Sequence, residues 1–462
     1  MSSKYCIVGA GPAGLSLSRV FRKAFQGKDI QFEVFEKHDE VGGIWNRDNP
    51  GTPIYESAHF ISSKTQSGYF DYPMPDHYPD YPSYRQIQQY HSRFADEFGL
   101  REFIHFNTVV QHIERQADLW KVTLGNGEVK LFDGVICANG TTWHPNVPEF
   151  PGDFDGDIIH ASQYSDPGIF KGKRVLVVGA GNSGCDIACD AASHAEQAWI
   201  SVRRGYHFIP KHIFGEPADV FDHKSSFLPL WLTRPVSQVL LQTLVGDLTQ
   251  WGLPKPDHKL YETHPIINDQ LIHYLRHGDI RGKSNIKRLN GQRVEFVDGS
   301  SEAVDLIVLA TGYNWKIPYM DEANFTWRGN RPNLFFNLFS SKFNSLFALG
   351  FMETNGGAYK LFDQMANLIA QNIIDQEENP RRAEEFKKIV TSEQWDLSGG
   401  VKYLNIDRNA AYVNIDAYRK AMDKLIKRMQ WDGLVPGMFD DMKVPLNSYQ
   451  KESSLEVEKA IV

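Results

Sequence analysis

Two glycine patterns in the chain have the spacing of backbone turns that bind phosphate groups. Gly9, Gly11 and Gly14 follow a strand predicted at 4–8, and the stretch VLVVGAGNSG at 175–184 repeats the same spacing. Glycines so placed let the backbone approach a pyrophosphate, whose charge meets the positive N-terminal end of the next helix. One such pattern is weak evidence, but two between predicted strands and helices predict two dinucleotide sites.

The residues that follow each pattern by about 20 positions predict which dinucleotide binds there. Glu36 comes 22 residues after Gly14. A carboxylate at this position accepts hydrogen bonds from a ribose and repels a 2′-phosphate. Arg203 and Arg204 come 19 and 20 residues after Gly184, and two guanidinium groups suit the extra phosphate of NADPH. The alternative for this arginine pair is a solvated basic turn.

A second glycine-rich segment, EVGGIW at 40–45, supports FAD as the dinucleotide of the first site. Gly42 and Gly43 give the backbone freedom to come close to a cofactor, and Trp45 offers a ring that packs on it. Taken alone, the segment is equally well explained as a turn with a buried tryptophan. The expected cofactors are FAD and NADPH.

The elements that must position these residues occur twice along the chain. Each half contains a strand, a glycine pattern, a helix and a second strand, followed later by a hairpin that turns at 126–127 or at 298–299. Seven residues after Asn126 and Asp298 comes an aspartate, Asp133 or Asp305, and each precedes an Ala-x-Gly sequence by five residues. This repetition predicts two related folding units.

The predicted fold is α/β, with two Rossmann-like dinucleotide-binding domains and the smaller inserted in the larger. We expect the FAD-binding domain at 1–170 and 284–462 and the NADPH-binding domain at 171–283. The part at 380–462 is expected to be helical. The segment 417–429 is amphipathic at helical spacing and is expected to pack on the larger domain.

The composition is that of an ordinary globular protein, with 42% apolar and 23% charged residues. A net charge of −8 without a long basic run argues against a nucleic-acid partner. Arg234 and Asp247 interrupt the most apolar segment, 225–253, too early for a helix that crosses a bilayer. MSSKY leads directly into a strand without a leader, and the four cysteines suit a reducing compartment, so we expect a cytoplasmic enzyme. The sequence has no residue spacing typical of a metal site, so no metal is expected. The oligomeric state stays open, with a homodimer as one alternative.

The linker between the glycine patterns reads FDGDIIHASQY and contains Phe154, Gly156, His160 and Tyr164. It resembles the signature FxGxxxHxxx(Y/F) of class B flavin-dependent monooxygenases, and ATGY at 310–313 resembles that family's second-domain motif. The resemblance covers nearly the whole chain and is closest to the flavin-containing monooxygenases. The Baeyer–Villiger branch is less similar, because its signature continues with tryptophan where this chain has Tyr164.

The resemblance implies that NADPH reduces FAD and that the reduced flavin traps O2 as a C4a-hydroperoxyflavin. The distal oxygen then passes to a soft nucleophile such as an amine or a sulfide. The cofactor performs this chemistry while the protein positions it and excludes water, so no catalytic base is expected. From the residues alone His160 is either a satisfied linker histidine or a functional one. The resemblance gives it a part in the link between the domains.

The patterns and the resemblance together give the expected cofactor contacts. Val110 is implied by the resemblance alone to reach the adenine end of FAD through its backbone. The expected FAD contacts are Gly9, Gly11, Gly14, Glu36, Gly43, Ile44, Trp45 and Val110. The expected NADPH contacts are Gly179, Gly181, Asn182, Ser183, Gly184, Arg203 and Arg204.

One stretch departs from the family pattern. The family has an asparagine beside the flavin, within a Ser-x-x-x-Asn-x-x-Lys-like stretch, and the segment SAHFISSK places Ile61 at that position between Ser57 and Lys64. An isoleucine side chain cannot form hydrogen bonds. Either His59 or Ser62 replaces it, or activated oxygen escapes as hydrogen peroxide and NADPH oxidation is partly uncoupled.

The segment 204–221 and the apolar 225–253 are expected to line or cover the substrate approach. Tyr206, His207 and Phe208 are candidate pocket residues, with ordinary packing as the alternative. The substrate itself stays open among amines, thioethers, indole-like aromatics and ketones.

Four other functions compete with amine or sulfide oxygenation. The nearest are Baeyer–Villiger oxygenation of ketones and largely uncoupled NADPH oxidation. A disulfide reductase needs two cysteines beside the flavin, whereas Cys185 and Cys189 fall on the helix of the second pattern, where a disulfide would strain the helix. A non-catalytic dinucleotide sensor is the fourth alternative.

Overall fold

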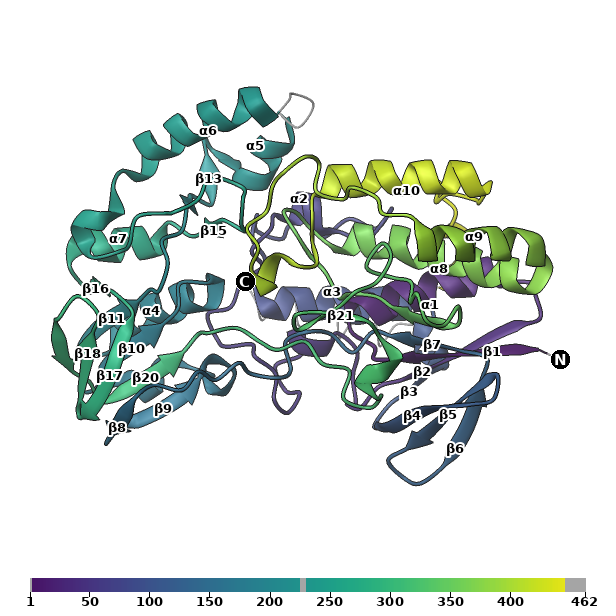
Figure 1. Ribbon diagram of the computed structural model, residues 1–462, viewed down its shortest axis with the longest axis horizontal. Coiled ribbons are helices and arrows are strands. Elements are labelled where there is room, and N and C mark those ends of the chain that lie inside the picture. The colour runs from purple at the N-terminus through teal and green to yellow at the C-terminus, as the bar shows by residue number, and fades with distance from the viewer. Residues whose placement is uncertain (1, 225–229, 445–462) are drawn as a thin grey trace.

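Two parallel sheets lie side by side and define two domains (Figure 1). The computed structural model describes residues 2–224 and 230–444. The chain leaves the first sheet after residue 137 and returns to it at residue 346, so the smaller domain is inserted in the larger. The predicted α/β fold with two Rossmann-like domains is confirmed.

The first sheet belongs to the larger domain, on the right of Figure 1, and has the order β23-β7-β1-β2-β3, all parallel. Helix α1 (Pro12–Ala24) starts at the first glycine pattern, and proline is tolerated there because its missing N–H would be unpaired. The strands are β1 (Ser3–Val8), β2 (Ile30–Phe35), β3 (Ile104–His105), β7 (Gly134–Cys137) and β23 (Leu346–Ala348).

The second sheet, on the left of Figure 1, has the order β16-β11-β10-β20-β9 and is also parallel. Helix α4 (Asn182–His194) starts at the second glycine pattern and packs with α7 (Gln270–His277). The strands are β9 (Asp157–His160), β10 (Arg174–Val178), β11 (Gln197–Ser201), β16 (Ile280–Lys283) and β20 (Leu306–Leu309).

The two repeated aspartates perform the same task in the two sheets. The Asp133 carboxylate accepts the backbone N–H of Lys4 at 2.8 Å, at the start of β1. The Asp305 carboxylate accepts the backbone N–H of Arg174 at 2.8 Å, at the start of β10. Each aspartate therefore fixes the register between the first strand of its sheet and the strand that carries the Ala-x-Gly sequence.

Two strands of the second sheet lie outside the range 171–283 that was predicted for the smaller domain. The predicted range 171–283 would leave β20 in the larger domain, whereas the structure pairs β20 with β10, with Val175 opposite Leu306. On the other side, β9 joins the second sheet as the neighbour of β20. By sheet membership the smaller domain extends from β9 to β20, beyond the predicted range at both ends.

Both predicted hairpins are present, and each turns at a glycine with positive φ. Gly127 (φ +87°) joins β5 (Leu119–Leu124) to β6 (Val129–Phe132), and Gly299 (φ +85°) joins β18 (Arg293–Phe296) to β19 (Ser301–Ala303). Two further antiparallel strands complete these small sheets, β4 (Val110–Gln116) and β17 (Ile286–Gly291), and β8 (Gly152–Phe154) joins β17 in parallel.

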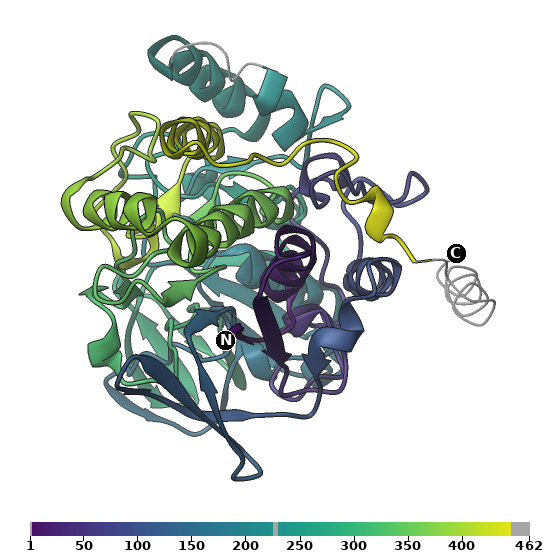
Figure 2. The same cartoon turned by 90° about the vertical axis from the view of Figure 1, so that its right-hand side faces the viewer.

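Helices and the β4-β5-β6 sheet cover opposite sides of the first sheet (Figures 1 and 2). Helix α8 (Tyr359–Glu378) packs on α1, and α9 (Pro380–Ser392) and α10 (Ile415–Met429) pack on α8. The predicted amphipathic helix at 417–429 is therefore confirmed, with Tyr418, Met422 and Leu425 buried. The prediction for 380–462 is not tested at 445–462, which lies outside the described residues.

The insert of the smaller domain contains short strands and helices between β11 and α7. They include β12 (Phe208–Ile209), β13 (His212–Ile213), β14 (Glu216–Pro217), α5 (Ala218–Lys224), α6 (Leu230–Val245), η5 (Leu248–Trp251) and β15 (Ile266–Ile267). The predicted apolar segment 225–253 thus forms α6 and η5, while residues 225–229 lie outside the described residues.

Two carboxylates on α4, one helical turn apart, join this helix to the rest of the molecule. Tyr55 donates its hydroxyl to Asp186 at 2.9 Å, and Ser57 donates to Asp190 at 2.5 Å. Tyr164 of the linker also donates to Asp190, at 2.8 Å. The chain at 55–57 and the linker therefore meet on the helix that follows the second glycine pattern.

Asp186 makes the stability of this junction dependent on pH. Burial raises the pKa of Asp186 to about 6 from the usual 3.8, against the opposing effects of Tyr55, Lys211 and Asn268. Because the native state then binds the proton more tightly than the unfolded chain, the stabilisation is full below about pH 4 and is lost as the pH rises to about 6. Asp186→Asn removes this titration.

Between about pH 4.5 and pH 7, wild type should lose roughly 1–3 kcal/mol of its free energy of unfolding through Asp186. Asp186→Asn should not show this loss, so its free energy of unfolding should rise by that amount relative to wild type. Urea unfolding at both pH values measures the difference. A difference between the two proteins that is the same at both pH values would show that the Asp186 carboxylate titrates as in the unfolded chain.

Candidate functional site

The first glycine turn brings the start of α1 into contact with the ends of β1 and β7. Gly9 has φ +106°, and a Cβ there would lie 2.7 Å from the Ala138 carbonyl oxygen. A Cβ on Gly14 would overlap the Gly9 carbonyl. Only glycine fits either position, so the N–H groups at the start of α1 stay open to an anion.

Glu36 lies at the end of β2, directly beside this turn. Its carboxylate accepts the backbone N–H groups of Ala10 at 2.7 Å and His38 at 3.0 Å. Burial raises the pKa of Glu36, while these two hydrogen bonds act in the opposite direction. Each carboxylate oxygen keeps a further lone pair, so Glu36 can accept a ribose hydroxyl next to the glycine turn.

The EVGGIW segment lies against the first turn. Gly42 (φ +102°) and Gly43 (φ +60°) lead into the short helix η1 (Gly43–Trp45), and a Cβ on Gly43 would lie 3.1 Å from the Gly11 Cα. The Trp45 ring packs against Phe60, with ring centres 5.1 Å apart. The turn and η1 together form one wall beside the glycine pattern.

Buried polar atoms without partners mark this wall as a binding surface. His38 Nε2 and Gln88 Oε1 are buried and have no hydrogen-bond partner among the described residues. The chain at 108–110 runs beside Glu36, since Thr108 donates its N–H to the Glu36 carbonyl at 2.8 Å, and Val110 begins β4. The residues present therefore fit a dinucleotide such as FAD, which the glycine turn, Glu36 and the chain at 108–110 would hold.

The second glycine turn reproduces the first. Gly179 has φ +105°, and a Cβ there would lie 2.5 Å from the Ala310 carbonyl oxygen. A Cβ on Gly184 would overlap the Gly179 carbonyl. Asn182 Oδ1, in the first turn of α4, is buried and has no hydrogen-bond partner among the described residues. The turn therefore fits the pyrophosphate of a second dinucleotide, and Asn182 Oδ1 can accept a hydrogen bond from a hydroxyl or amide group of that dinucleotide.

Two adjoining cavities open beside this turn. A cavity of about 440 Å³ is lined by Arg203 and Arg204, and a cavity of about 420 Å³ reaches Ala180 in the glycine turn. Arg203 is exposed, whereas Arg204 is paired with Asp257 at 3.0 Å. Both cavities are lined by Gly205, Pro254 and Lys255.

The candidate substrate residues Tyr206, His207 and Phe208 line the cavity that reaches Ala180. Phe208 is buried in β12, and His207 Nε2 donates to the His258 carbonyl at 2.8 Å. The structure thus brings all three together, beside the second glycine turn.

The linker signature connects β9 to the Ala-x-Gly segment of the second sheet. A Cβ on Gly156 would lie 2.5 Å from the Asp305 carbonyl oxygen, so the linker can cross β20 only with glycine there. His160 Nδ1 accepts the N–H of Ser162 at 3.1 Å, which leaves Nε2–H to donate to the Gly312 carbonyl at 3.1 Å. Burial lowers the pKa of His160. His160 therefore acts as a neutral structural link.

Phe154 and Tyr164 anchor the two ends of this signature. Phe154 ends β8 and packs beside the cluster that covers one face of the second sheet. Tyr164 is buried and stacks on Phe170, with ring centres 5.1 Å apart, while its hydroxyl donates to Asp190. The signature residues are therefore packing and hydrogen-bonding residues at the junction of the two domains.

The segment 57–64, which departs from the family pattern, has an exposed apolar side chain. Ile61 is 37% exposed. Ser62 accepts a hydrogen bond from Ser67 at 2.8 Å, and His59 is exposed with Nδ1 2.9 Å from the Ser57 carbonyl.

Sequence reasoning missed Ser63, which follows this segment. Its hydroxyl is buried without a partner among the described residues, and its N–H donates to Asp219 of α5 at 2.7 Å. The insert therefore contacts the segment 57–64 of the larger domain directly. No local pattern marks this contact, because the two residues are 156 positions apart.

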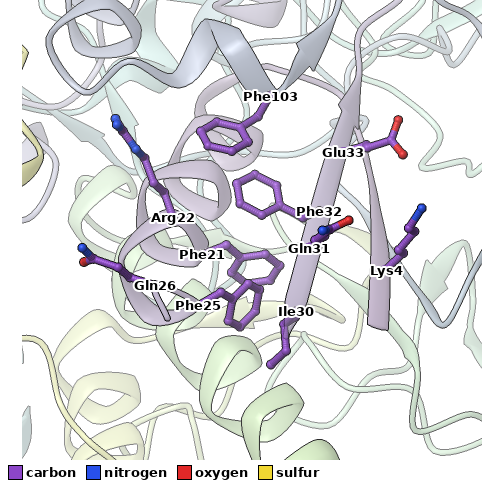
Figure 3. A pocket seen from close by; sticks show the side chains of 10 residues that line it. All are labelled: Lys4, Phe21, Arg22, Phe25, Gln26, Ile30, Gln31, Phe32, Glu33 and Phe103. Carbon is purple, nitrogen blue, oxygen red and sulfur yellow. The ribbon is translucent and has the colours of Figure 1, made fainter. Parts of the chain in front are cut away.

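A cavity of about 320 Å³ at the far end of α1 belongs to neither glycine turn (Figure 3). Phe21, Phe25 and Phe32 line it, and the Phe21 and Phe25 ring centres are 4.7 Å apart. Phe21 comes nine residues after Pro12, which corresponds to roughly 13 Å along the helix. These rings belong to the core of the larger domain.

The cysteines are free and buried. Cys185 and Cys189 lie on α4 in the core of the smaller domain, away from the first glycine turn, which disfavours the disulfide reductase. Within residues 2–224 and 230–444, no group of three histidine, cysteine, aspartate or glutamate side chains forms a metal site. In the same part of the chain, each helix is too short or too polar to span a membrane.

Comparison with known proteins gives one consistent family. A family model described as flavin-binding monooxygenase-like matches residues 2–430. The rat flavin-containing monooxygenase 5 is 30% identical over 434 residues, which cover 86% of this chain and 80% of the relative. The human flavin-containing monooxygenase 3 is 31% identical over 406 residues, which cover 81% and 74%.

Solved structures share the fold at lower identity. The S-allyl-L-cysteine S-oxygenase from Allium sativum matches with a TM-score of 0.63 at 20% identity, over 99% of this chain and 93% of that one. An open structure of cyclohexanone monooxygenase matches with a TM-score of 0.63 at 17% identity, over 93% and 99%.

These comparisons agree with the two glycine turns and the linker between them. The predicted resemblance, the enzyme class of monooxygenase and the cofactors FAD and NADPH are confirmed. The chain therefore belongs to the flavin-binding monooxygenase-like family, and the matched residues 2–430 include both glycine turns and the linker.

Proposed function

We propose that the chain is an NADPH- and O2-dependent monooxygenase that transfers one oxygen atom to a soft nucleophile, an amine or a sulfide. The observation that carries this proposal is the pairing of two dinucleotide turns with opposite charge. Glu36 lies beside the first turn, while Arg203 and Arg204 lie beside the second. The first favours a dinucleotide without a 2′-phosphate and the second favours one that has it.

The first turn holds FAD in this proposal. The N–H groups at the start of α1 bind its pyrophosphate, Glu36 accepts a ribose hydroxyl, and His38 and Gln88 offer polar atoms that have no partner within the described chain. The FAD contacts are Gly9, Gly11, Gly14, Glu36, Gly43, Ile44, Trp45 and Val110.

The second turn holds NADPH. The N–H groups at the start of α4 bind the pyrophosphate, and Asn182 Oδ1 accepts a hydrogen bond from a hydroxyl or amide group of the nucleotide. Tyr206, His207 and Phe208 line the cavity that continues from this turn, so we assign them to the nucleotide side rather than to the substrate. The NADPH contacts are Gly179, Gly181, Asn182, Ser183, Gly184, Arg203 and Arg204.

When bound, NADPH supplies the electrons and the reduced flavin supplies the activation of O2. The chain contributes position and shielding. Tyr55, Ser57 and Tyr164 hold α4 against the flavin-side segment, and Asp219 ties the insert to Ser63. His160 holds the linker on the second sheet and neither gives nor takes a proton in the reaction.

A largely uncoupled NADPH oxidase is the second candidate function. The observation that favours it is the apolar, partly exposed Ile61 where the family has an asparagine. Because the fold is shared with a cyclohexanone monooxygenase, Baeyer–Villiger oxygenation of a ketone is kept as an alternative reaction. The four free cysteines suit a reducing compartment, and we propose the cytoplasm as the location.

The deciding experiment loads the protein with FAD and reduces it with NADPH without oxygen. Aerated buffer with an amine, a thioether, an indole or a ketone is then added, and the oxygenated product is quantified. We expect product from the amine or the thioether. Protein that does not bind FAD would overturn the proposal, and product from the ketone alone would replace it with Baeyer–Villiger oxygenation.

The arginine pair gives a prediction about coenzyme choice. Replacing Arg203 and Arg204 together by alanine should weaken NADPH binding by roughly tenfold to 100-fold, because both arginines line the cavity to which we assign the 2′-phosphate. NADH binding should change by less than about threefold, since it lacks this phosphate. Titration of the FAD-loaded protein with each coenzyme measures both constants.

Arg281 provides the matched control for this pair. It is an exposed arginine on the neighbouring strand β16, opposite Trp199 of β11. Arg281→Ala should leave both coenzymes unaffected. Equal weakening of NADPH and NADH by the double variant would mean that the arginines do not read the phosphate.

Ile61 gives a prediction about coupling. The wild-type protein should release appreciable hydrogen peroxide per NADPH consumed, and Ile61→Asn should lower that share because it restores a side chain that forms hydrogen bonds. Peroxide and oxygenated product are measured together in the presence of a good substrate. Val129→Asn changes a 50% exposed side chain on β6 and should leave the ratio unchanged. Near-complete coupling in the wild type would contradict the prediction.

A further inference from the structure

A histidine bridges two tyrosines inside the core of the larger domain. His91 lies on α3 (Tyr84–Glu97) and is fully buried. Its Nδ1 lies 3.1 Å from the Tyr69 hydroxyl, and its Nε2 lies 3.1 Å from the Tyr359 hydroxyl. Both tyrosines are buried as well. The two ring nitrogens of His91 are therefore each used by a phenol, at a place that solvent does not reach.

The direction of these hydrogen bonds follows from the atoms that take part. Burial lowers the pKa of His91 to about 3, so the ring is neutral and carries one N–H. Tyr69 donates its one hydroxyl hydrogen to the Pro12 carbonyl at 3.3 Å, and it therefore accepts the Nδ1–H of His91. Nε2 is left as an acceptor, and Tyr359 donates to it. The hydrogen bonds thus run in one direction, from Tyr359 to Pro12.

The two ends of this chain of hydrogen bonds lie at the first dinucleotide site. Pro12 opens α1, directly after the first glycine turn. Tyr359 opens α8 and packs on Phe60, which packs in turn on Trp45 of η1, with ring centres 5.4 and 5.1 Å apart. Burial raises the pKa of Tyr359, and a hydrogen bond from Trp45 acts in the opposite direction. Through His91, η1 is linked to the start of α1.

This link matters because η1 and the start of α1 meet through glycines. A Cβ on Gly43 would lie 3.1 Å from the Gly11 Cα, so the two backbones touch without a side chain between them. Glycine has wide backbone freedom, and such a contact does not by itself fix one arrangement. A buried hydroxyl that loses its partner is costly, so the chain of hydrogen bonds favours the arrangement in which every donor is used.

We propose that His91 is a positioning residue for FAD, which holds Trp45 and the first turn of α1 in the arrangement that binds the cofactor. His91 acts through Tyr359 and Tyr69, because both of its ring nitrogens are occupied by them. This inference rests on the proposed function, since it assumes that Trp45 and the first glycine turn contact FAD.

Four single variants test this role. His91→Phe keeps a ring and removes both hydrogen bonds, whereas His91→Gln returns one donor and one acceptor on an amide. Tyr359→Phe removes the hydroxyl that donates to His91. His264→Phe is the matched control in the insert, because burial lowers the pKa of His264 to about 3 as well and its Nδ1 lies 2.9 Å from the Tyr412 hydroxyl.

Two measurements on the full chain are needed. Titration of the FAD-stripped protein gives the dissociation constant of FAD, and visible circular dichroism of the loaded protein reports how the chain surrounds the flavin. His91→Phe should weaken FAD binding by roughly threefold to 30-fold and change the dichroism. His91→Gln should restore most of both. Tyr359→Phe should act in the same direction as His91→Phe, and the double variant should add little, because both changes remove the same hydrogen bond.

His264→Phe should equal wild type in both measurements. Folded His91→Phe protein with wild-type affinity and dichroism would show that His91 stabilises the core alone, and the inference would be wrong. It would also be wrong if His91→Gln restored neither quantity, or if the control variant changed them as much. Where His91→Phe does not fold, Tyr359→Phe decides in the same way, because it loses one hydroxyl and keeps its ring.

Gly11→Ala separates failure of this inference from failure of the proposed function. A Cβ on Gly11 would lie no closer than 3.6 Å to any described atom that could obstruct it, so the variant should fold. Its methyl group would nevertheless fill the approach to the pyrophosphate. If Gly11→Ala weakens FAD binding but His91→Phe and Tyr359→Phe do not, the inference is wrong and the FAD site stands. If none of the three weakens it, both are wrong.

Discussion

The close approach of a glycine turn to the end of a neighbouring strand is the constraint on which the rest of the structure depends. Gly9 lies against the Ala138 carbonyl and Gly179 against the Ala310 carbonyl, with nearly equal φ values of +106° and +105°. A side chain at either glycine would push the helix away from the sheet. The open N–H groups at the helix start, and hence both dinucleotide sites, exist only because this contact is allowed.

The two domains meet through side chains rather than through a continuous sheet. Asp186 and Asp190 lie one turn apart on α4 and receive hydroxyl groups from Tyr55, Ser57 and Tyr164. The same helix begins at the second glycine turn, so its contacts with Tyr55 and Ser57 also position that turn relative to the larger domain. Domains joined by side-chain contacts are expected to move relative to each other more readily than domains that share a sheet.

The insert is more than a cover over the substrate path. It touches the flavin-side segment through Asp219 and Ser63, and it reaches the arginine cavity through the backbone of Lys255. Its residues 206–208 line the cavity beside the second turn. The insert thus contacts the segment 57–64 of the larger domain and also lines the cavity beside the second glycine turn.

The sequence by itself determined the features that depend on neighbours along the chain. Both glycine turns, both hairpins and the amphipathic helix follow from local backbone freedom and from periodicity, and the repeated Asp133 and Asp305 identify the paired strands. The tertiary structure alone decided the domain boundaries and the places of Ser63 and Lys255. These depend on contacts between residues 50 to 156 positions apart, which no local spacing encodes because packing and chain reversal bring them together.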